Sequence, residues 1–241
     1  MVSGRGAGSV ANATNTPRPA STPTSTPAPG RASTGDVATP GRRTYDASGR
    51  RAAAERRRAH VVETASRLFA AHGWSGTTIA ALAREAQVSP EYVTKTFGGK
   101  QALLMEAVRS ASFGRSASLP AAYAGLRLGD EPDREVRLDR FVDFVCDSVE
   151  PMAPFLPAMN QGAADDERMR TILGAARGGH VDIIRAVVPL LAPGPVRPDA
   201  VDEVVVLTRG ETYLVFAAEL GWTRERYAAW LRRSIDAAVT G

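Results

Sequence analysis

The chain has 241 residues and a formal net charge of +4, with 44% hydrophobic and 23% charged residues. This composition is that of a globular protein of one or two domains. Cys146 is the only cysteine, which excludes a disulfide within the chain. Because no apolar run reaches the length of a signal peptide or a transmembrane helix, we expect a cytoplasmic protein that makes no membrane contact.

The charge is unevenly distributed along the chain. Residues 1–110 carry 15 Lys and Arg against 7 Asp and Glu, whereas residues 111–241 carry 15 against 19. Residues 1–48 are rich in Ala, Gly, Ser, Thr and Pro and contain almost no large apolar side chain, so we expect a disordered basic tail. The excess of positive charge before residue 110 is typical of phosphate binding, although a merely solvated tail would also produce it.

The first predicted domain, 49–110, begins with Arg50, Arg51 and residues 56–58, all arginine. Such arginines either contact a nucleic-acid backbone or minor groove, or only solvate the start of a helix. An apolar stripe at helical spacing follows, and Gly73 is placed to end this first helix. The stripe consists of Val61, Ala65, Leu68 and Phe69.

Two short helices are predicted next, over about 78–85 and 89–96. Thr78 and Ser89 are suitable N-caps, and Pro90 fits the first helical position, where a missing N–H costs nothing. A short helix, a tight turn and a second helix with polar tips form the helix-turn-helix layout, in which the second helix enters the major groove of DNA. A fourth helix begins near Lys100.

The second predicted domain, 111–241, contains only helical periodicity, so the predicted fold class is all-α. Glycine and proline interrupt the helices at several points, and Thr223 caps the last helix. The predicted order is a weak or interrupted region at 114–134, a helix centred on Phe141 and Val145, a kinked piece through Pro151, Pro154 and Pro157, and long helices over 165–191 and 198–220.

Residues from about 56 to 108 resemble the DNA-binding domain of tetracycline-repressor (TetR) family regulators. The matching residues keep many fixed spacings, so the resemblance is far more specific than a generic helix-turn-helix. They are Ala65, Leu68, Phe69, Gly73, Thr77, Thr78, Ile79, Leu82, Ala83, Ala86, Val88, Ser89, Phe97, Lys100, Ala102, Leu103 and Leu104.

The chain departs from the family pattern at two positions. Gln87 stands in the turn where the family usually has glycine, which tolerates a positive φ. Thr94 stands where the family usually has a tyrosine that contacts a DNA phosphate. We expect Gln87 to lower local stability slightly, and Thr94 to keep a hydroxyl but with shorter reach.

The resemblance implies that double-stranded DNA, in the form of a palindromic operator, is read by the second helix of the motif. Lys95 and Lys100 are expected to bind phosphates, and Glu91 and Tyr92 to lie beside base edges. Glu91 has a competing role, since a carboxylate in the first turn stabilises the helix dipole. The complete set of predicted DNA-binding residues is Thr78, Ser89, Pro90, Glu91, Tyr92, Thr94, Lys95 and Lys100.

The resemblance also implies a C-terminal domain that binds a small-molecule effector and forms a homodimer through its last two helices. Flexible and aromatic side chains are candidates for the effector pocket, although each is also suited to an ordinary core. These candidates are Met105, Phe144, Met152, Phe155, Met159, Met169 and Leu173, with Asp139, Arg140, Arg170 and His180 as possible polar partners. The candidate dimer-interface residues are Val205, Leu214, Tyr227, Trp230 and Leu231.

We find no pattern that predicts catalysis, a cofactor or a metal site. The three histidines, His60, His72 and His180, are scattered, and Cys146 lies in an apolar helix, as a buried thiol would. The prediction is therefore a regulator of transcription, most simply a repressor, rather than an enzyme. An activator, a repressor that senses no ligand, and a small-molecule-binding or protein-interaction protein with degenerate DNA binding remain alternatives.

Overall fold

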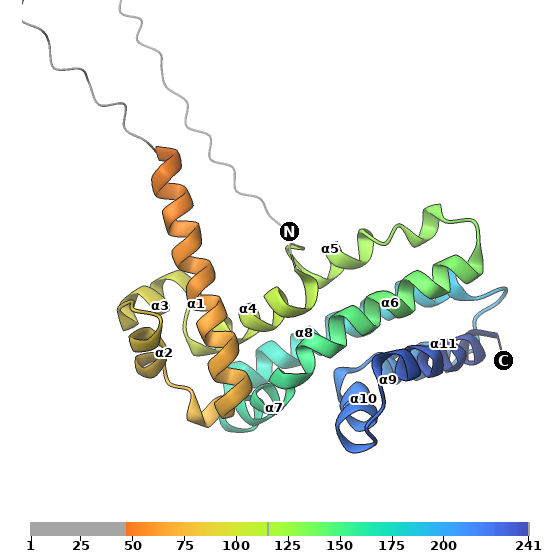
Figure 1. Cartoon of the computed structure of the whole chain (residues 1–241). Helices are drawn as coiled ribbons and strands as arrows, with labels where there is room; N and C mark the ends of the chain where they lie inside the picture. The colour runs from red at the N-terminus through yellow and green to blue at the C-terminus, as the bar shows by residue number, and fades with distance from the viewer. Residues whose placement is uncertain (1–46, 115, 241) are drawn as a thin grey trace, which may run out of the picture. The chain divides into compact units, whose positions relative to one another are not determined.

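The computed structural model describes residues 47–114 and 116–240, so the predicted disordered tail lies almost wholly outside the described residues. The described part of the chain contains helices and no strand, which confirms the all-α prediction. Figure 1 shows the helices in chain order.

The first four helices form the predicted helix-turn-helix unit. They are α1 (Ala47–Gly76), α2 (Ile79–Glu85), α3 (Pro90–Phe97) and α4 (Lys100–Phe113). α1 begins several residues before its apolar stripe, and its N-terminal turns are mostly exposed. Its regular helix is interrupted at Gly73, where φ is 64°, which confirms glycine as the residue that turns the chain there.

The remaining helices follow the predicted order, with the weak region at 114–134 forming only short pieces. Pro151 lies inside its helix, and the next two prolines begin the short segments that follow. The elements are α5 (Leu119–Ala124), η1 (Leu128–Asp130), α6 (Arg134–Met152), η2 (Ala153–Phe155), α7 (Leu156–Asp165), α8 (Glu167–Leu191), α9 (Ala200–Leu207), α10 (Gly210–Leu214), η3 (Val215–Glu219) and α11 (Arg224–Thr240).

The single helix predicted over 198–220 is wrong. The structure breaks it after α9, restarts it as α10 and ends it in the π-helical turn η3. The Thr208 hydroxyl donates to the Val204 carbonyl at 2.7 Å, and Thr208 leaves helical geometry. A Cβ at Gly210 would lie 2.7 Å from Met152 Cε and 3.0 Å from Leu156 Cδ1, so α10 starts in close contact with these two side chains, which would have to shift to admit a larger residue. Apolar periodicity alone does not report such a break.

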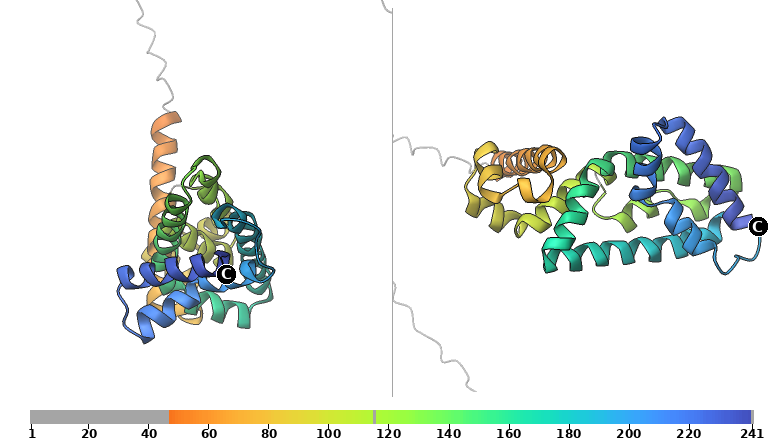
Figure 2. Two further views of the ribbon diagram at one scale, coloured as in Figure 1. Left: turned by 90° about the vertical axis from the view of Figure 1, so that its right-hand side faces the viewer. Right: turned by 90° about the horizontal axis from the view of Figure 1, so that it is seen from below.

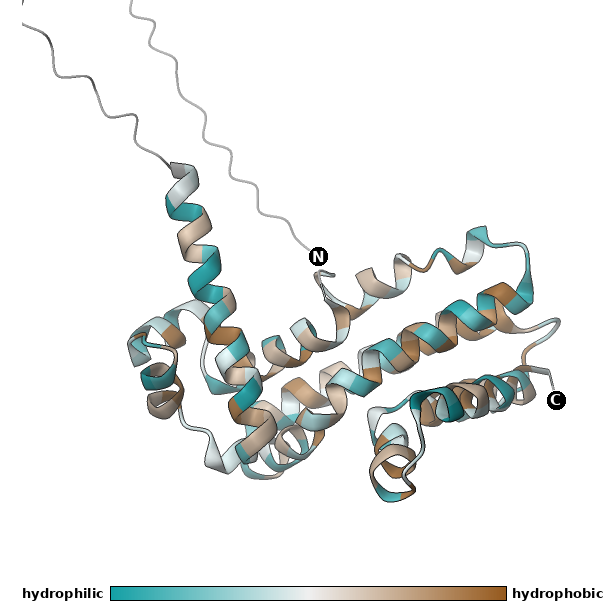
Figure 3. Ribbon diagram, viewed as in Figure 1, coloured by the Kyte–Doolittle hydropathy of each residue, from teal (hydrophilic) through white to brown (hydrophobic). Residues whose placement is uncertain are grey.

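Two apolar clusters make up the core. One joins the buried faces of α1–α4 to η2, α7 and the start of α8. The other joins α6, the end of α8, α9 and α11. Figure 2 shows α2 and α3 at one end of the described body and α11 at the other. Figure 3 shows the apolar residues distributed along all of these helices. The helix-turn-helix unit therefore shares its core with the second domain.

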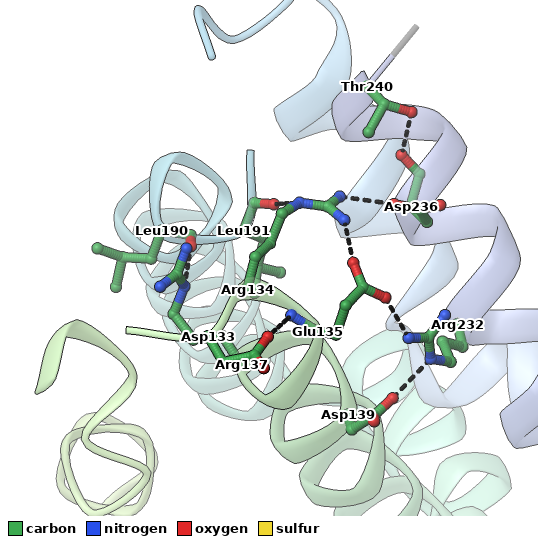
Figure 4. Close-up of polar contacts among 10 residues, drawn as sticks. All are labelled: Asp133, Arg134, Glu135, Arg137, Asp139, Leu190, Leu191, Arg232, Asp236 and Thr240. Atoms are coloured by element: carbon green, nitrogen blue, oxygen red, sulfur yellow. Dashed lines mark hydrogen bonds and ion pairs between the residues drawn. The ribbon is translucent and has the colours of Figure 1, made fainter. Parts of the chain in front are cut away.

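A network of arginines and carboxylates joins α6 to α8 and α11 (Figure 4). The Arg134 guanidinium donates to the Leu191 carbonyl at 2.7 Å and to Asp236 at 2.6 Å. Arg232 on α11 bonds Glu135 and Asp139 on α6 at 2.6 and 2.5 Å. These bonds satisfy carbonyls at the end of α8 and hold α11 along α6.

Gln87 adopts a φ of 55° in the turn of the helix-turn-helix motif, and its side chain is exposed. A side chain in left-handed geometry costs roughly 1–2 kcal/mol, a cost that glycine does not have. We therefore predict that Gln87→Gly raises the free energy of unfolding by about 0.5–1 kcal/mol, as measured by urea denaturation.

Ala80 provides the matched control, because it is an exposed residue within α2 with ordinary helical geometry. Ala80→Gly is expected to lower the free energy of unfolding by about 0.5–1 kcal/mol. If the two glycine substitutions destabilise the protein equally, the left-handed turn is not a source of strain.

Candidate functional site

Capping side chains define the ends of the two helices of the motif. The Thr78 hydroxyl oxygen accepts from the Ala81 amide at 3.1 Å at the start of α2. Ser89 accepts from the Tyr92 amide at 3.1 Å at the start of α3, and Pro90 lies in its first turn. The caps predicted from the sequence are thus confirmed, and they fix where α3 begins relative to α2.

The exposed side of α3 carries the residues predicted to meet DNA. Pro90, Glu91, Thr94 and Lys95 are exposed, whereas Tyr92 is half-buried against the core. The opposite side is buried through Val93 and Phe97, as predicted. This division leaves one polar face of α3 available to a groove, but the individual DNA contacts stay predictions.

Thr94 and Lys100 both have partners within the protein. The Thr94 hydroxyl donates to the Pro90 carbonyl at 3.1 Å. Lys100 Nζ donates to the Trp74 carbonyl at 2.6 Å and lies 3.9 Å from the centroid of the Trp74 ring. Burial lowers the pKa of Lys100, with opposing effects from Asp166 and Asp165. Lys100 is therefore built into the fold, which weakens its predicted role as a phosphate partner.

Two arginines of α1 lie next to the motif. The Arg57 guanidinium is 5.9 Å from the centroid of the Tyr92 ring, so positive charge lies beside the recognition helix. Arg58 lies 4.9 Å from the centroid of Phe97 and pairs with Glu106 at 2.7 Å. Hydrogen bonds from Arg109 and Arg58 lower the pKa of Glu106 to about 2, which keeps this carboxylate charged and Arg58 neutralised. Arg57 is thus the better candidate for a phosphate contact.

Trp74 joins the DNA-binding unit to α7. Gln161 Oε1 accepts from the backbone amides of Trp74 and Ser75 at 3.1 and 3.2 Å. A Cβ at Gly162 would lie 2.9 Å from the indole ring, so the ring packs directly on the backbone of α7. Gln101 adds a bond of 2.9 Å to Asp166.

A cavity of about 280 Å³ lies among α4, α5, α6, α7 and α8 and the break between α9 and α10. Five of the seven residues predicted for a ligand pocket line it: Met105, Phe144, Met152, Met159 and Leu173. The other two, Phe155 and Met169, do not line it; their side chains are buried in the core shared with the DNA-binding unit. Of the predicted polar partners, only His180 lines the cavity.

The rest of the polar lining and one aromatic wall were not predicted from the sequence. Arg177, Thr208, Arg209 and Glu211 line the cavity together with His180, and Tyr123 also lines it. Tyr123 packs 4.5 Å from Phe144, centroid to centroid, and burial raises its pKa. Residues 208–211 were placed inside a continuous helix, so the sequence contained no signal that they reach a cavity.

The predicted dimer residues divide into two groups. Val205, Tyr227 and Leu231 are at most 7% exposed within a single chain, so they fill its own core and are not available to a partner. Their burial counts against a place in the interface, and the interface itself stays a prediction. Leu214 and Trp230 are half-buried. Large apolar side chains that are exposed include Val206, Val215 and Leu220, at 59%, 43% and 57%.

Cys146 is fully buried, and burial raises its pKa to about 11, so it is a neutral thiol at neutral pH. No group of three or more His, Cys, Asp or Glu side chains within 47–114 and 116–240 is arranged to hold a metal ion. In the same residues no helix is long and apolar enough to cross a membrane.

Residues 61–107 match the family model described as bacterial regulatory proteins, tetR family. No curated protein sequence gives a significant match. Three solved structures share the fold at low sequence identity. One is described as a transcriptional regulator from Pseudomonas aeruginosa PAO1, with 19% identity and a TM-score of 0.58 over 76% of this chain and 90% of that chain.

The other two are described as TetR-family transcriptional regulators. The structure from Rhodococcus sp. has 21% identity and a TM-score of 0.57 over 76% of this chain and 99% of that chain. The structure from Streptomyces coelicolor has 20% identity and a TM-score of 0.52 over 77% and 95%. Residues 61–107 are therefore similar to the helix-turn-helix DNA-binding domain of the tetR family, and the chain shares its helical fold with structures described as TetR-family transcriptional regulators.

Proposed function

We propose that the protein is a homodimeric repressor that binds a palindromic operator and is released from it by a small-molecule effector. One observation carries the proposal: the same chain has an exposed polar face on α3 and a cavity whose walls include α4 and α7. Both helices also contact the turn at Trp74.

DNA reading is supported by the caps and the charge of the motif. Ser89 and Pro90 fix the start of α3, and Lys95 ends it with an exposed cation. Arg57 adds positive charge beside Tyr92. In a helix-turn-helix complex such cations bind phosphates, while side chains near the start of the recognition helix reach base edges.

Effector release is supported by the connection between the cavity and the DNA-binding unit. Met105 and Val108 of α4 line the cavity, and Lys100 and Gln101 at the other end of α4 bond the Trp74 carbonyl and Asp166. A ligand that favours a shifted position of α4 or α7 therefore shifts α1–α3 as well. Release then follows from different affinities of the ligand for two conformations.

Dimerisation is supported by the exposed apolar residues near the chain end. The candidates are Val206 on α9, Val215 on η3 and Leu220, which directly follows η3. We propose these exposed residues for the dimer interface in place of the buried residues named from the sequence. A symmetric dimer presents two copies of α3 to two half-sites of the operator.

The direct test is a titration of the full chain against its own upstream DNA and a scrambled control, at low and physiological salt. We expect selective binding that survives physiological salt. Lys95→Ala is expected to weaken binding to both DNAs and to reduce the slope of log K against log salt by about one unit, because one phosphate contact is lost.

Lys100→Ala is the contrasting variant in this titration. Because Nζ of Lys100 bonds the Trp74 carbonyl, we expect a lower melting temperature and an unchanged salt slope. The contradicting outcome is wild-type binding that is equal on both DNAs and disappears at physiological salt. It would argue against operator reading and favour the alternative of a helical protein with degenerate DNA binding.

The dimer surface is tested by placing charge on it. Val206→Glu and Leu220→Glu are expected to convert a dimer into a monomer in light scattering coupled to gel filtration, because each buries an unpaired carboxylate in the interface. Leu190→Glu is the matched control, since Leu190 is 38% exposed but lies on α8. A dimer that survives both charged substitutions would place the interface elsewhere.

A further inference from the structure

The cavity has an apolar body and one polar end. Its apolar walls include Met105, Phe144, Met159 and Leu173. The polar side chains come from α8 and from the break between α9 and α10, namely Arg177, His180, Thr208, Arg209 and Glu211. The Arg177 side chain is 43% exposed, so the polar end is also the end that reaches solvent.

His180 and Thr208 form a neutral, fixed pair at this end. His180 Nε2 lies 3.0 Å from the Thr208 hydroxyl oxygen. The Thr208 hydroxyl also bonds the Val204 carbonyl at 2.7 Å, so this side chain is held between α9 and His180. Burial lowers the pKa of His180, against an opposing hydrogen bond with the Val205 backbone, and the Arg209 charge adds to the lowering, so the ring is uncharged at neutral pH.

The charges at the polar end do not balance. Arg177 pairs with Glu211 at 2.9 Å and also bonds Asn160. Arg209, by contrast, forms no ion pair with any residue in the described part of the chain. With His180 neutral, Arg177, Glu211 and Arg209 leave one net positive charge at the mouth of an apolar cavity.

We propose that the effector is a small single-chain amphipathic molecule with one anionic head group, such as a medium-chain carboxylate. This inference rests on the proposed effector role of the cavity. The apolar chain occupies the body of the cavity, and the head group pairs with Arg209. Arginine binds carboxylates through two parallel N–H donors, and such charge-assisted bonds are about twice as strong as neutral ones.

The size of the cavity agrees with this class of ligand. Its volume of about 280 Å³ lies just below the roughly 300–1,000 Å³ found for small-molecule sites, which favours a slender molecule over a multi-ring one. The unbranched methionines in its walls adapt to a flexible chain. A cationic amphiphile would meet Arg209 with like charge.

The test is calorimetric titration of the full chain with decanoate, decanol and decylamine, each below its aggregation threshold. We expect decanoate to bind at least tenfold tighter than decanol, and decylamine to bind weakest. Arg209→Gln is expected to weaken decanoate binding by about 10- to 100-fold while leaving decanol binding unchanged, because only the charged pair is lost. Arg209→Lys retains the charge and is expected to lose less.

Arg233→Gln is the matched control, because Arg233 is an exposed arginine on α11 that does not line the cavity. Equal affinities for decanoate and decanol, equal losses in Arg209→Gln and Arg233→Gln, or no binding of any of the three probes would overturn the proposal. If Arg209→Gln fails to fold, the comparison of the three probes on the wild type still tests whether the cavity prefers an anionic head group. The same preparation is also titrated with DNA. Selective DNA binding without decanoate binding would overturn only the effector proposal, whereas loss of selective DNA binding would count against the proposed function.

Discussion

The packing of Trp74 on the backbone of α7 ties the helix-turn-helix unit to the remaining helices. The indole ring lies against Gly162, the amide of Trp74 bonds Gln161, and its carbonyl receives the ammonium group of Lys100. Three elements, α1, α4 and α7, therefore meet at one turn. Removing any partner would leave a polar group of this turn unsatisfied or open a gap under the ring.

This arrangement determines how the two halves of the molecule communicate. The DNA-binding unit shares its apolar core with α7 and the start of α8, so it does not hang on a flexible linker. The same helices form walls of the cavity, and α4 runs from the cavity to Lys100. Packed cores change between discrete arrangements rather than deforming continuously, so these contacts are the route by which the proposed effector would act on the orientation of α3.

The sequence predicted what depends on local chemistry. Thr78, Ser89 and Pro90 identify their helix ends because capping is a short-range effect, and the positive φ of Gln87 follows from the turn that the motif requires. The break at Thr208 and Gly210 was missed because it depends on Met152 and Leu156, which are distant in sequence. The prediction of which apolar residues are buried within one chain was limited for the same reason. Apolar spacing does not distinguish Tyr227, which is buried within one chain, from a residue that faces a second chain.

The central claim is that two copies of α3 read a symmetric DNA site. The most direct measurement is a selection of binding sequences from a random DNA library by the full chain at physiological salt. If two copies of α3 read a symmetric site, we expect an enriched inverted repeat whose half-sites are centred about 10 base pairs, or a multiple of that, apart. A pool that shows no enriched sequence after repeated rounds, or one enriched without any two-fold symmetry, would contradict it.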